Sequence, residues 1–426
     1  MKNFKLFLLY LFLIFPFIQA YNLRERPLWV RSQTKDRLSD ILQGRIENNK
    51  INLRNSQIGD EEAKKLARAL EENYFLQSLE LDNNQIWCEG VRAIATVLKM
   101  SDSLKDLYVD NNPIGDVGVD VLSEALKNKK ELRCLSLFGV NMRDKGAIVL
   151  AKILEENDSL ESLELGNNRI ENVGVEAISK ALKHKKLRFL GLSEVEMGNK
   201  GAIALAEALE ESDSLEGLYL NNNRIGDAGV EALSKALKRH KRLNFLSLNE
   251  VEMGEEGAIA LAKALEESDS LKSLYLSDNR IGNEGVRVIL KALKRHKGLK
   301  FLNLYGVEMG EEGAIALAKA LEESDSLESL NLDDNQIFDG GVMAFAKLLK
   351  SHKKLRSLSL RKVGMGDEGA VTLAEALEKS DSLEILYLSD NEIRDEGLKA
   401  LLETKEKNKR FKFLDLLDDL IEDVEA

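Results

Sequence analysis

Four histidines recur along the chain at a spacing that could place them in one row. His184, His240, His296 and His352 are separated by 56 residues each and lie in basic segments such as KALKRHKRL. Histidine is a common zinc ligand, but one zinc ion needs three or four ligands, and no Cys or Asp accompanies these histidines at ligand spacing. The pattern therefore indicates a repeated structural position, and we expect neither a metal ion nor another cofactor.

Aromatic and acidic residues alternating with leucines form a second pattern that could carry function. Exposed aromatics among polar groups are typical of protein-binding hot spots, and acidic neighbours favour a basic partner. Aromatic pairs that only stabilise a sheet are the alternative interpretation. The aromatic residues are Tyr108, Phe189, Tyr219, Phe245, Tyr275, Phe301, Tyr305 and Tyr387. The acidic residues, which we expect to be exposed, are Glu80, Asp82, Asp106, Asp110, Glu164, Asp333 and Asp334.

Asparagine forms a third repeated row. A carboxamide offers both donors and acceptors, so a stacked row can satisfy the backbone of the turns that leave successive strands. We interpret this row as structural, with ligand contact as the alternative. Its members are Asn84, Asn112, Asn168, Asn223, Asn279, Asn335 and Asn391.

The sequence carries no pattern of catalytic chemistry. It contains no nucleotide-binding loop of the form GxxxxGK[ST], and no nucleophile stands in a motif with a base. We therefore expect a protein that is not an enzyme and has no small-molecule substrate.

These residues recur because the chain is built from repeats. VEMGEEGAIALAKALEESDSL occupies residues 251–271 and returns unchanged at 307–327, 56 residues later. Halfway between such copies lies a second pattern, as in LYLNNNRIGDAGVEALSKAL from Leu218. Aligned on LxxLxLxxN, the two patterns (B and A repeats) give thirteen repeats of about 28 residues over 51–410. Self-similarity at this period predicts a solenoid.

Each repeat combines a strand period with a helix period. The LxLxL alternation predicts a short strand, and the spacing of Val230, Leu233 and Leu237 predicts a helix with one apolar stripe. We expect Asp227 to cap this helix and Gly229 to allow the tight turn before it. Stacking then predicts an α/β horseshoe with parallel strands on the concave face and helices on the convex face.

The pattern LxxLxLxxNxIGxxGxxxLxxAL, with its A and B alternation over about residues 51–416, resembles the ribonuclease-inhibitor type of leucine-rich repeat. NOD-like receptors contain similar repeat regions. The resemblance implies a leucine-rich repeat solenoid that acts as a protein-binding scaffold or receptor-like protein through its concave face. The chain departs from the cysteine-rich ribonuclease inhibitors at the Asn position of its B repeats, where it has Val140, Val195, Val251, Val307 and Val363.

Two other functions stay open. A GTPase-activating protein similar to the Ran GTPase activators would share this repeat type and an acidic tail. An inhibitor similar to ribonuclease inhibitor is the second possibility.

The ends of the chain differ from the repeats. Lys2 and Lys5 precede an apolar run of thirteen residues, and Ala20 offers a small residue for cleavage. This layout predicts a signal peptide over 1–20 and a secreted or cell-surface protein, since a membrane-spanning helix needs roughly 20 apolar residues. A retained anchor is the alternative. Residues 21–50 are expected to form an N-terminal cap, and 411–426 a C-terminal cap with an acidic tail.

Charge distribution bounds the partners. The net charge of −12 argues against nucleic acid, because phosphate binding needs a basic face. B helices end in EESDS and A helices in basic loops, so stacking predicts ion pairs along one rim. Cys88 and Cys134 predict no disulfide, and Asn157 begins an N-x-[ST] sequon that could carry a glycan. We expect a monomer that binds a protein.

Overall fold

The computed structural model describes residues 46–47, 49–70, 75–183, 185–267, 270–294, 297–323 and 326–416. The chain divides into two compact units, residues 1–43 and 44–426, and every described residue belongs to the second. The predicted signal peptide, most of the predicted N-terminal cap, His184, His296 and the acidic tail beyond Leu416 lie outside the described residues. No helix within these ranges is long and apolar enough to cross a membrane.

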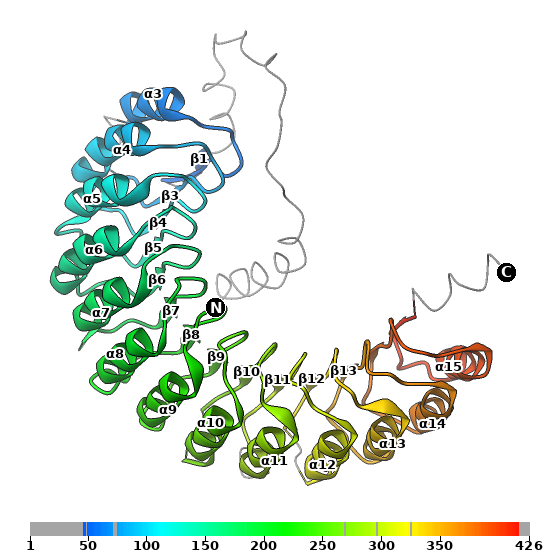
Figure 1. Cartoon of the computed structure of the whole chain (residues 1–426). Coiled ribbons are helices and arrows are strands. Elements are labelled where there is room, and N and C mark those ends of the chain that lie inside the picture. Colours follow the sequence, from blue (N-terminus) through cyan, green and yellow to red (C-terminus); the bar gives the residue numbers. More distant parts are fainter. Residues whose placement is uncertain are drawn as a thin grey trace. The chain divides into compact units, whose positions relative to one another are not determined.

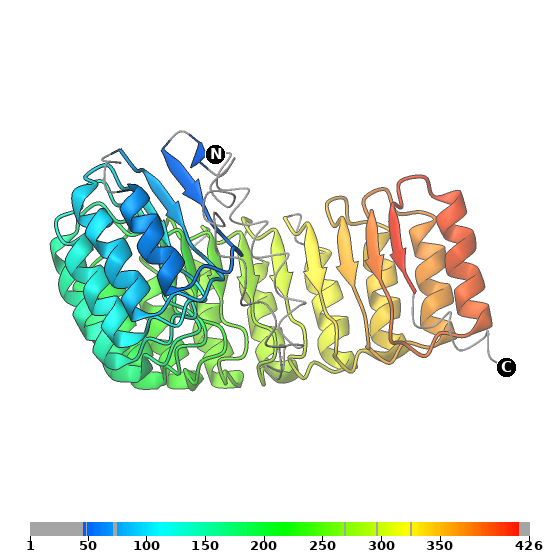
Figure 2. The ribbon, with the colours of Figure 1, turned by 90° about the horizontal axis from the view of Figure 1, so that it is seen from above.

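One sheet runs through the whole second unit, with its strands in the order of the sequence (Figure 2). The first two strands are antiparallel, and all later neighbours are parallel. The strands are β1 (Ile46–Glu47), β2 (Lys50–Asn52), β3 (Ser78–Glu80), β4 (Asp106–Tyr108), β5 (Cys134–Ser136), β6 (Ser162–Glu164), β7 (Phe189–Gly191), β8 (Gly217–Tyr219), β9 (Phe245–Ser247), β10 (Ser273–Tyr275), β11 (Phe301–Asn303), β12 (Ser329–Asn331), β13 (Ser357–Ser359), β14 (Ile385–Tyr387) and β15 (Phe413–Asp415).

A helix follows each strand from β2 to β14 and lies on the outer side of the curve, while the strands line the inner side (Figure 1). This arrangement confirms the predicted α/β leucine-rich repeat solenoid. The helices are α3 (Asp60–Leu70), α4 (Cys88–Met100), α5 (Gly115–Leu126), α6 (Asp144–Glu156), α7 (Glu171–Leu182), α8 (Asn199–Leu209), α9 (Gly226–Leu237), α10 (Glu255–Glu267), α11 (Gly282–Leu293), α12 (Glu311–Leu321), α13 (Phe338–Leu349), α14 (Asp367–Leu377) and α15 (Asp395–Lys407).

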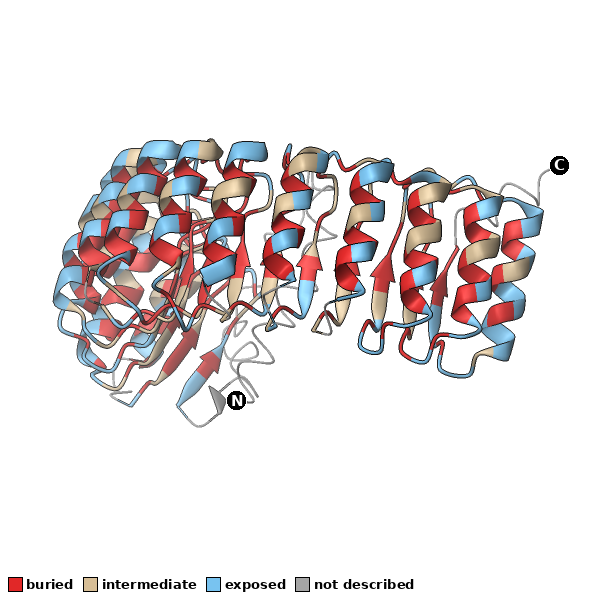
Figure 3. Ribbon diagram, turned by 90° about the horizontal axis from the view of Figure 1, so that it is seen from below, coloured by how far each residue is buried: buried red, intermediate tan, exposed pale blue. Residues whose placement is uncertain are grey.

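The core lies between the sheet and the helices. In the repeat that starts at Leu215, the strand leucines Leu218 and Leu220 are fully buried, as is Val230 on the facing helix α9. Figure 3 shows the same division in every helix, with a buried stripe and an exposed outer face. Each fully buried aliphatic side chain contributes about 1.5–3 kcal/mol of transfer free energy, so stacking repeats supplies the stability that one repeat lacks.

The Asn row satisfies the backbone of two repeats at once. The Asn223 Nδ2 group donates to the carbonyl oxygens of Leu220 in its own repeat at 2.8 Å and of Leu192 in the preceding B repeat at 2.7 Å. Its Oδ1 accepts the N–H groups of Val195 and Met197 from that B repeat at 3.2 and 3.0 Å. Because each Asn reaches back one repeat, the B repeats can place a buried valine at this position.

A second device joins each A repeat to the B repeat that follows it. Gly226 has a left-handed backbone, with φ of +61°, and its N–H donates to the carbonyl oxygen of Val251 at 2.9 Å. Four other residues share this conformation and this bond to a valine carbonyl: Gly115, Glu171, Gly282 and Phe338. Trp87, at the same position but followed by another A repeat, has an extended backbone.

Two expectations about the helix start are wrong. Asp227 does not cap its own helix, because its Oδ1 accepts the N–H groups of Gly254 and Gly257 in the next repeat at 2.7 and 2.9 Å. Gly229 lies inside α9, and the turn before the helix uses the left-handed Gly226 instead. Gly229 is needed for space, since a Cβ there would lie 2.9 Å from the Cβ of Ala202 in the preceding helix.

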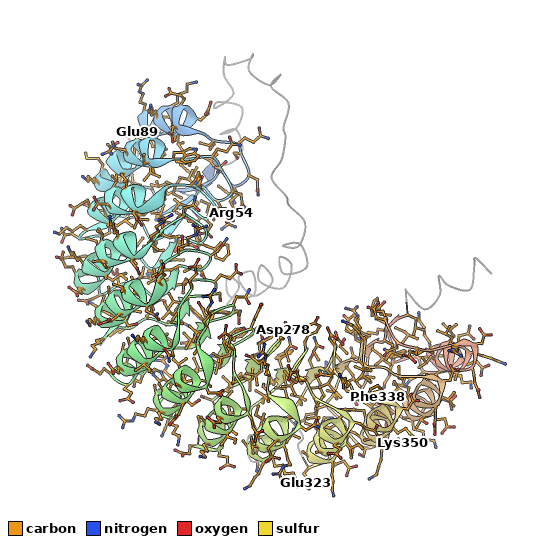
Figure 4. All side chains as sticks on the ribbon, in the orientation of Figure 1. Arg54, Glu89, Asp278, Glu323, Phe338 and Lys350 are labelled. Carbon is orange, nitrogen blue, oxygen red and sulfur yellow. The ribbon has the colours of Figure 1, made fainter. Side chains whose placement is uncertain are left out.

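The predicted rim of opposite charges is present on the outer side. Lysines just after A helices pair with glutamates at or just after the ends of B helices at N–O distances of 2.6 to 3.0 Å, and Figure 4 shows Glu323 on this side. The pairs are Lys183–Glu211, Lys238–Glu267 and Lys294–Glu323.

The two described histidines are structural parts of the same loops. His240 is buried and its Nε2 donates to the carbonyl oxygen of Leu209 at 2.7 Å, while burial lowers its pKa. The Nδ1 of His352 accepts the N–H of Leu355 at 3.0 Å. Among the described residues, no group of His, Cys, Asp and Glu could hold a metal ion.

Asn157 of the sequon is also engaged. Its Nδ2 donates to the carbonyl oxygen of Lys129 at 3.1 Å, and its Oδ1 accepts the N–H of Leu160 at 3.0 Å. A glycan on Nδ2 would leave one N–H there, so it would have to be accommodated beside the bond to Lys129. Both cysteines are free thiols.

Candidate functional site

Each of the strands β2 to β14, together with the residues just after it, presents three side chains to the inner side of the curve, because side chains alternate along extended backbone. For β8 these are Gly217 and Tyr219 of the strand and Asn221 two residues beyond it, which we assign to the first, second and third rows. The pairing register keeps each row straight from strand to strand. The second row reads Glu80, Tyr108, Ser136, Glu164, Gly191, Tyr219, Ser247, Tyr275, Asn303, Asn331, Ser359, Tyr387 and Asp415.

Aromatic residues of the first and second rows meet at the centre of the sheet. The ring centroids of Tyr219 and Phe245 are 4.6 Å apart, and those of Phe245 and Tyr275 are 5.2 Å apart. Phe189 continues this group on one side and Phe301 on the other, in register with the strands between them. We call these five residues the aromatic platform.

The platform is less exposed than the sequence suggested. Tyr219 keeps only 7 % of its surface exposed, so the expectation of an exposed side chain is wrong at this position. Its neighbours one repeat away cover it, and this lateral packing is invisible within a single repeat. Phe189, Phe245 and Tyr275 are half-buried, whereas Phe301 is 39 % exposed.

Two glycines let the side chains of the central strands lie flat on the sheet. A Cβ at Gly217 would lie 2.9 Å from the ring of Phe189. A Cβ at Gly191 would collide with the carboxylate of Glu164. The Glu164 carboxylate therefore bends over Gly191, toward the strand that carries Tyr219.

Glu164 is a half-buried carboxylate with backbone partners only. Its Oε1 accepts the N–H of Gly166 at 2.8 Å. None of the Lys and Arg side chains in the described ranges forms an ion pair with it, and burial raises its pKa to about 7. Burial, together with the charge of Glu164, also raises the pKa of Tyr219.

An arginine lies between a second-row tyrosine and a carboxylate at the N-terminal end of the sheet. Arg54 pairs with Glu80 at 3.2 Å and with Asp82, and its guanidinium carbon lies 5.3 Å from the ring centroid of Tyr108. Asp82 is 4 % exposed, so the expectation of exposure is wrong for this residue as well.

The same arrangement recurs at the C-terminal end. Arg361 pairs with Asp415, two repeats further along the chain, and its guanidinium carbon lies 4.4 Å from the ring centroid of Tyr387. Both of the chain's own arginines in the third row are therefore held against the sheet by neighbouring carboxylates and tyrosines.

The third row bonds successive repeats together. Asp110 accepts the hydroxyl of Ser136 at 2.6 Å and the N–H of Phe138 at 2.9 Å. Asn221 accepts the corresponding groups of Ser247 and Asn249 at 2.6 and 3.0 Å. Asp333, which is 7 % exposed and not exposed as expected, accepts the N–H of Arg361 at 2.8 Å. Burial and the nearby Asp82 raise the pKa of Asp110.

The remaining predicted residues lie on the same face. Tyr305 donates its hydroxyl to Asp334 at 3.1 Å, and Asp334 also pairs with Lys362 at 2.9 Å. Asp106 is half-buried in the first row beside Cys134, and burial raises its pKa.

The centre of the inner face is acidic, and among the described ion pairs the cation Lys362 reaches it only at Asp334 on its edge. From β5 to β12, the three rows and the left-handed residue after each third-row position contain no Lys or Arg. Sequence reasoning missed three acidic residues of this surface, Glu194, Glu250 and Asp278, all of which occupy such left-handed positions. Figure 4 shows Asp278 on the inner side of the curve. Other repeats have an asparagine at the equivalent position, such as Asn222. That asparagine was the sequence signal that could have located them, because Asn tolerates a positive φ.

One gap in the described interior offers no room for a ligand. A gap lined by Leu81, Val91, Val109 and Leu122 is too small to hold a water molecule.

A sequence family described as "Leucine Rich repeat" matches seven segments of the chain. Together with the fold, these matches support a leucine-rich repeat protein. The segments are residues 101–123, 156–179, 212–234, 268–290, 324–346, 351–374 and 379–402. Six of them cover A repeats, which carry the asparagine, and one covers a B repeat. No curated protein matches the sequence.

Two solved structures are similar in fold. A crystal structure of an internalin from Listeria monocytogenes has a TM-score of 0.54 and 21 % identity, covering 89 % of this chain and 88 % of the other. The crystal structure of the yeast complex of Rad7 and Elc1 contains a chain with a TM-score of 0.52 and 17 % identity, covering 80 % of this chain and 86 % of the other.

Proposed function

We propose that this leucine-rich repeat protein is a non-enzymatic scaffold that binds a protein partner through the inner face of its sheet. One observation carries the proposal: half-buried and exposed aromatic rings lie beside carboxylates that no cation of the described chain neutralises. Aromatic side chains surrounded by polar groups supply most of the binding free energy in many protein interfaces.

The charge of this face selects the partner. Glu194, Glu250 and Asp278 stand near the aromatic platform, and from β5 to β12 no Lys or Arg of the three rows opposes them. A partner with a basic surface would bring the missing cations and would associate faster at low ionic strength. The yeast neighbour in fold is recorded in a complex with another protein, which agrees with a role in protein binding.

The A and B alternation supports an assignment to the ribonuclease-inhibitor type of repeat, which we include in the proposal. We also propose that the protein acts outside the cytosol, on the basis of residues 1–20. Amino-terminal sequencing of protein recovered from the medium should give a chain that begins near Tyr21. Recovery only of full-length chain from the cytosol would exclude secretion.

A photo-cross-linking experiment tests the binding face. A benzophenone amino acid replaces Phe301, which is 39 % exposed on the inner face, or Ile315 on the outer helix α12, which is 42 % exposed. Because the two positions are equally accessible, only their location differs. We expect cross-links to one partner from position 301 and none from position 315.

Substitution then measures the contribution of the platform. The triple variant Phe245→Ala, Tyr275→Ala and Phe301→Ala should lose capture of the cross-linked partner. Tyr219 is retained because it is buried, so its replacement would lower the stability of the fold and confuse the binding result. The matched control replaces Ile148, Ile203 and Ile315 on outer helices. Equal capture by both triple variants would show that the inner face is the wrong surface.

A further inference from the structure

The second row contains three places where a carboxylate and a tyrosine face the same space. Glu80 and Tyr108 are adjacent at the N-terminal end, and Tyr387 and Asp415 are adjacent at the C-terminal end. In both places an arginine of the chain pairs with the carboxylate and lies near the tyrosine ring. The chain thus shows twice how this surface binds a guanidinium group.

The third place is at the centre, where Glu164 and Tyr219 stand on either side of Gly191. Successive strands are about 4.8 Å apart, so the two backbones are separated by roughly 10 Å, and Gly191 between them has no side chain of its own. The Glu164 carboxylate bends into this space over Gly191. No arginine or lysine of the described chain accompanies it there.

Arg188 is a candidate from the chain itself, since its guanidinium carbon lies 5.4 Å from the ring centroid of Phe189, but its carboxylate contacts exclude it. It lies at the edge of the sheet where the strands begin, and its guanidinium donates two hydrogen bonds of 2.9 Å to the two oxygens of Glu216. It also contacts Glu161 at 3.3 Å. Arg188 is therefore already paired in bidentate geometry, the strong form of this interaction.

We infer that the surface over Gly191, where the Glu164 carboxylate lies toward the strand of Tyr219, binds an arginine side chain of the partner polypeptide. Residues beside that arginine would be apolar and would lie on Phe189, Phe245 and Tyr275. The inference rests on the proposed function and names the chemistry of its central contact. Arginine fits better than lysine because a planar guanidinium can pair with a carboxylate and stack on an aromatic ring at once.

The test uses the full chain and the tripeptide acetyl-Phe-Arg-Phe-amide, observed by saturation-transfer NMR. The matched probe replaces arginine with citrulline, which keeps the shape and lacks the charge. We expect the arginine peptide to bind at least about tenfold more tightly than the citrulline peptide, because a charged hydrogen-bond partner is lost.

Two variants locate the contact. Glu164→Gln is nearly isosteric and should reduce the affinity for the arginine peptide to that for the citrulline peptide. Gly191→Ala should do the same by displacing the carboxylate. The control is Glu89→Gln, which removes a carboxylate from α4 on the outer side (Figure 4) and should leave the affinity unchanged.

Three results would overturn the inference: equal binding of the two peptides, unchanged binding by Glu164→Gln, or no saturation transfer to the arginine peptide. These results are distinct from a failure of the proposed function. If the platform triple variant loses its partner while Glu164→Gln retains it at full affinity, the scaffold function stands and the arginine contact is wrong.

Discussion

The side-chain oxygen of Asn223 accepts the backbone N–H of Val195 at 3.2 Å, although the two residues are 28 positions apart in the chain. The same carboxamide also serves Met197, Leu192 and Leu220. One polar side chain therefore satisfies buried backbone groups in two repeats.

Replacing this residue should be costly. Asn223→Ala leaves several buried donors and acceptors without partners, so we expect the free energy of unfolding to fall by about 2–4 kcal/mol. Urea unfolding followed by circular dichroism measures the change. Asn244→Ala removes an amide whose described bond is a 3.4 Å contact with the Arg242 carbonyl, and it should change stability by less than about 0.5 kcal/mol. Similar losses in the two variants would contradict the bridging role.

Substitution by glycine should have opposite effects on stability at two positions of helix α7, because Glu171 has a left-handed backbone. Glu171 has φ of +50°, where glycine is favoured, so Glu171→Gly should stabilise the protein by about 0.5–1 kcal/mol. Glu176→Gly, inside the same helix α7, should destabilise it by about 1 kcal/mol. Thermal unfolding of the two variants provides the comparison. A loss of stability in both would mean that Glu171 makes contacts that outweigh its strain.

Buried serines on the A helices offer a second matched pair. The Ser234 hydroxyl is buried and has no hydrogen-bond partner among the described residues, so Ser234→Ala should raise the free energy of unfolding by about 0.5–2 kcal/mol. Ser247 is buried as well, but its hydroxyl donates to Asn221 at 2.6 Å, so Ser247→Ala should lower stability by about 1 kcal/mol. Denaturant titrations of both variants decide the matter, and destabilisation by Ser234→Ala would indicate an unseen partner.

Glu164 should make stability depend on pH near neutrality. Its folded-state pKa of about 7 lies above that of an unfolded chain, near 4.3, so the folded protein holds a proton that the unfolded chain has released between these values. Stability is therefore lost as pH rises from about 4.5 to 7. Glu164→Gln lacks this loss. The difference in free energy of unfolding between the variant and the wild type should therefore shift by about 1–3 kcal/mol in favour of the variant between pH 4 and pH 8.

The same titration should govern the arginine peptide. Binding to the wild type should strengthen from pH 6 to pH 8 as Glu164 ionises, whereas binding to Glu164→Gln should not vary. A pH-independent difference in stability between the two proteins would show that burial leaves Glu164 ionised throughout.

The ion pairs of the outer rim should contribute little. Lys183–Glu211 and Lys238–Glu267 are partly or fully exposed, and such pairs stabilise proteins by about 0–1 kcal/mol each. Raising NaCl from 0.05 to 0.5 M, about a threefold shorter screening length, should therefore shift the melting temperature by only a few degrees. A large decrease would show that the rim carries more of the stability than its exposure implies.

The sequence predicted what is local to one repeat. Alternating leucines such as Leu218 and Leu220 located the strand, and Val230 and Leu233 located the buried stripe of the helix. The errors concern contacts that cross a repeat boundary. Asp227 caps the following helix, and Tyr219 is covered by rings from a neighbouring strand. The contacting residues of neighbouring repeats are about 28 positions apart in the sequence. Only the way the repeats stack determines whether a side chain contacts the preceding or the following repeat.

The reach of Asn223 and its equivalents also limits how this array can change length. A B repeat depends on an asparagine in the repeat after it, whereas an A repeat can precede either kind, as Asn84 and Asn112 show in consecutive repeats. Insertion of a lone B repeat would place two valines in succession and leave the first without its carboxamide. Viable duplications therefore add an A repeat or a whole 56-residue pair, and the identical copies at 251–271 and 307–327 are spaced by one such pair.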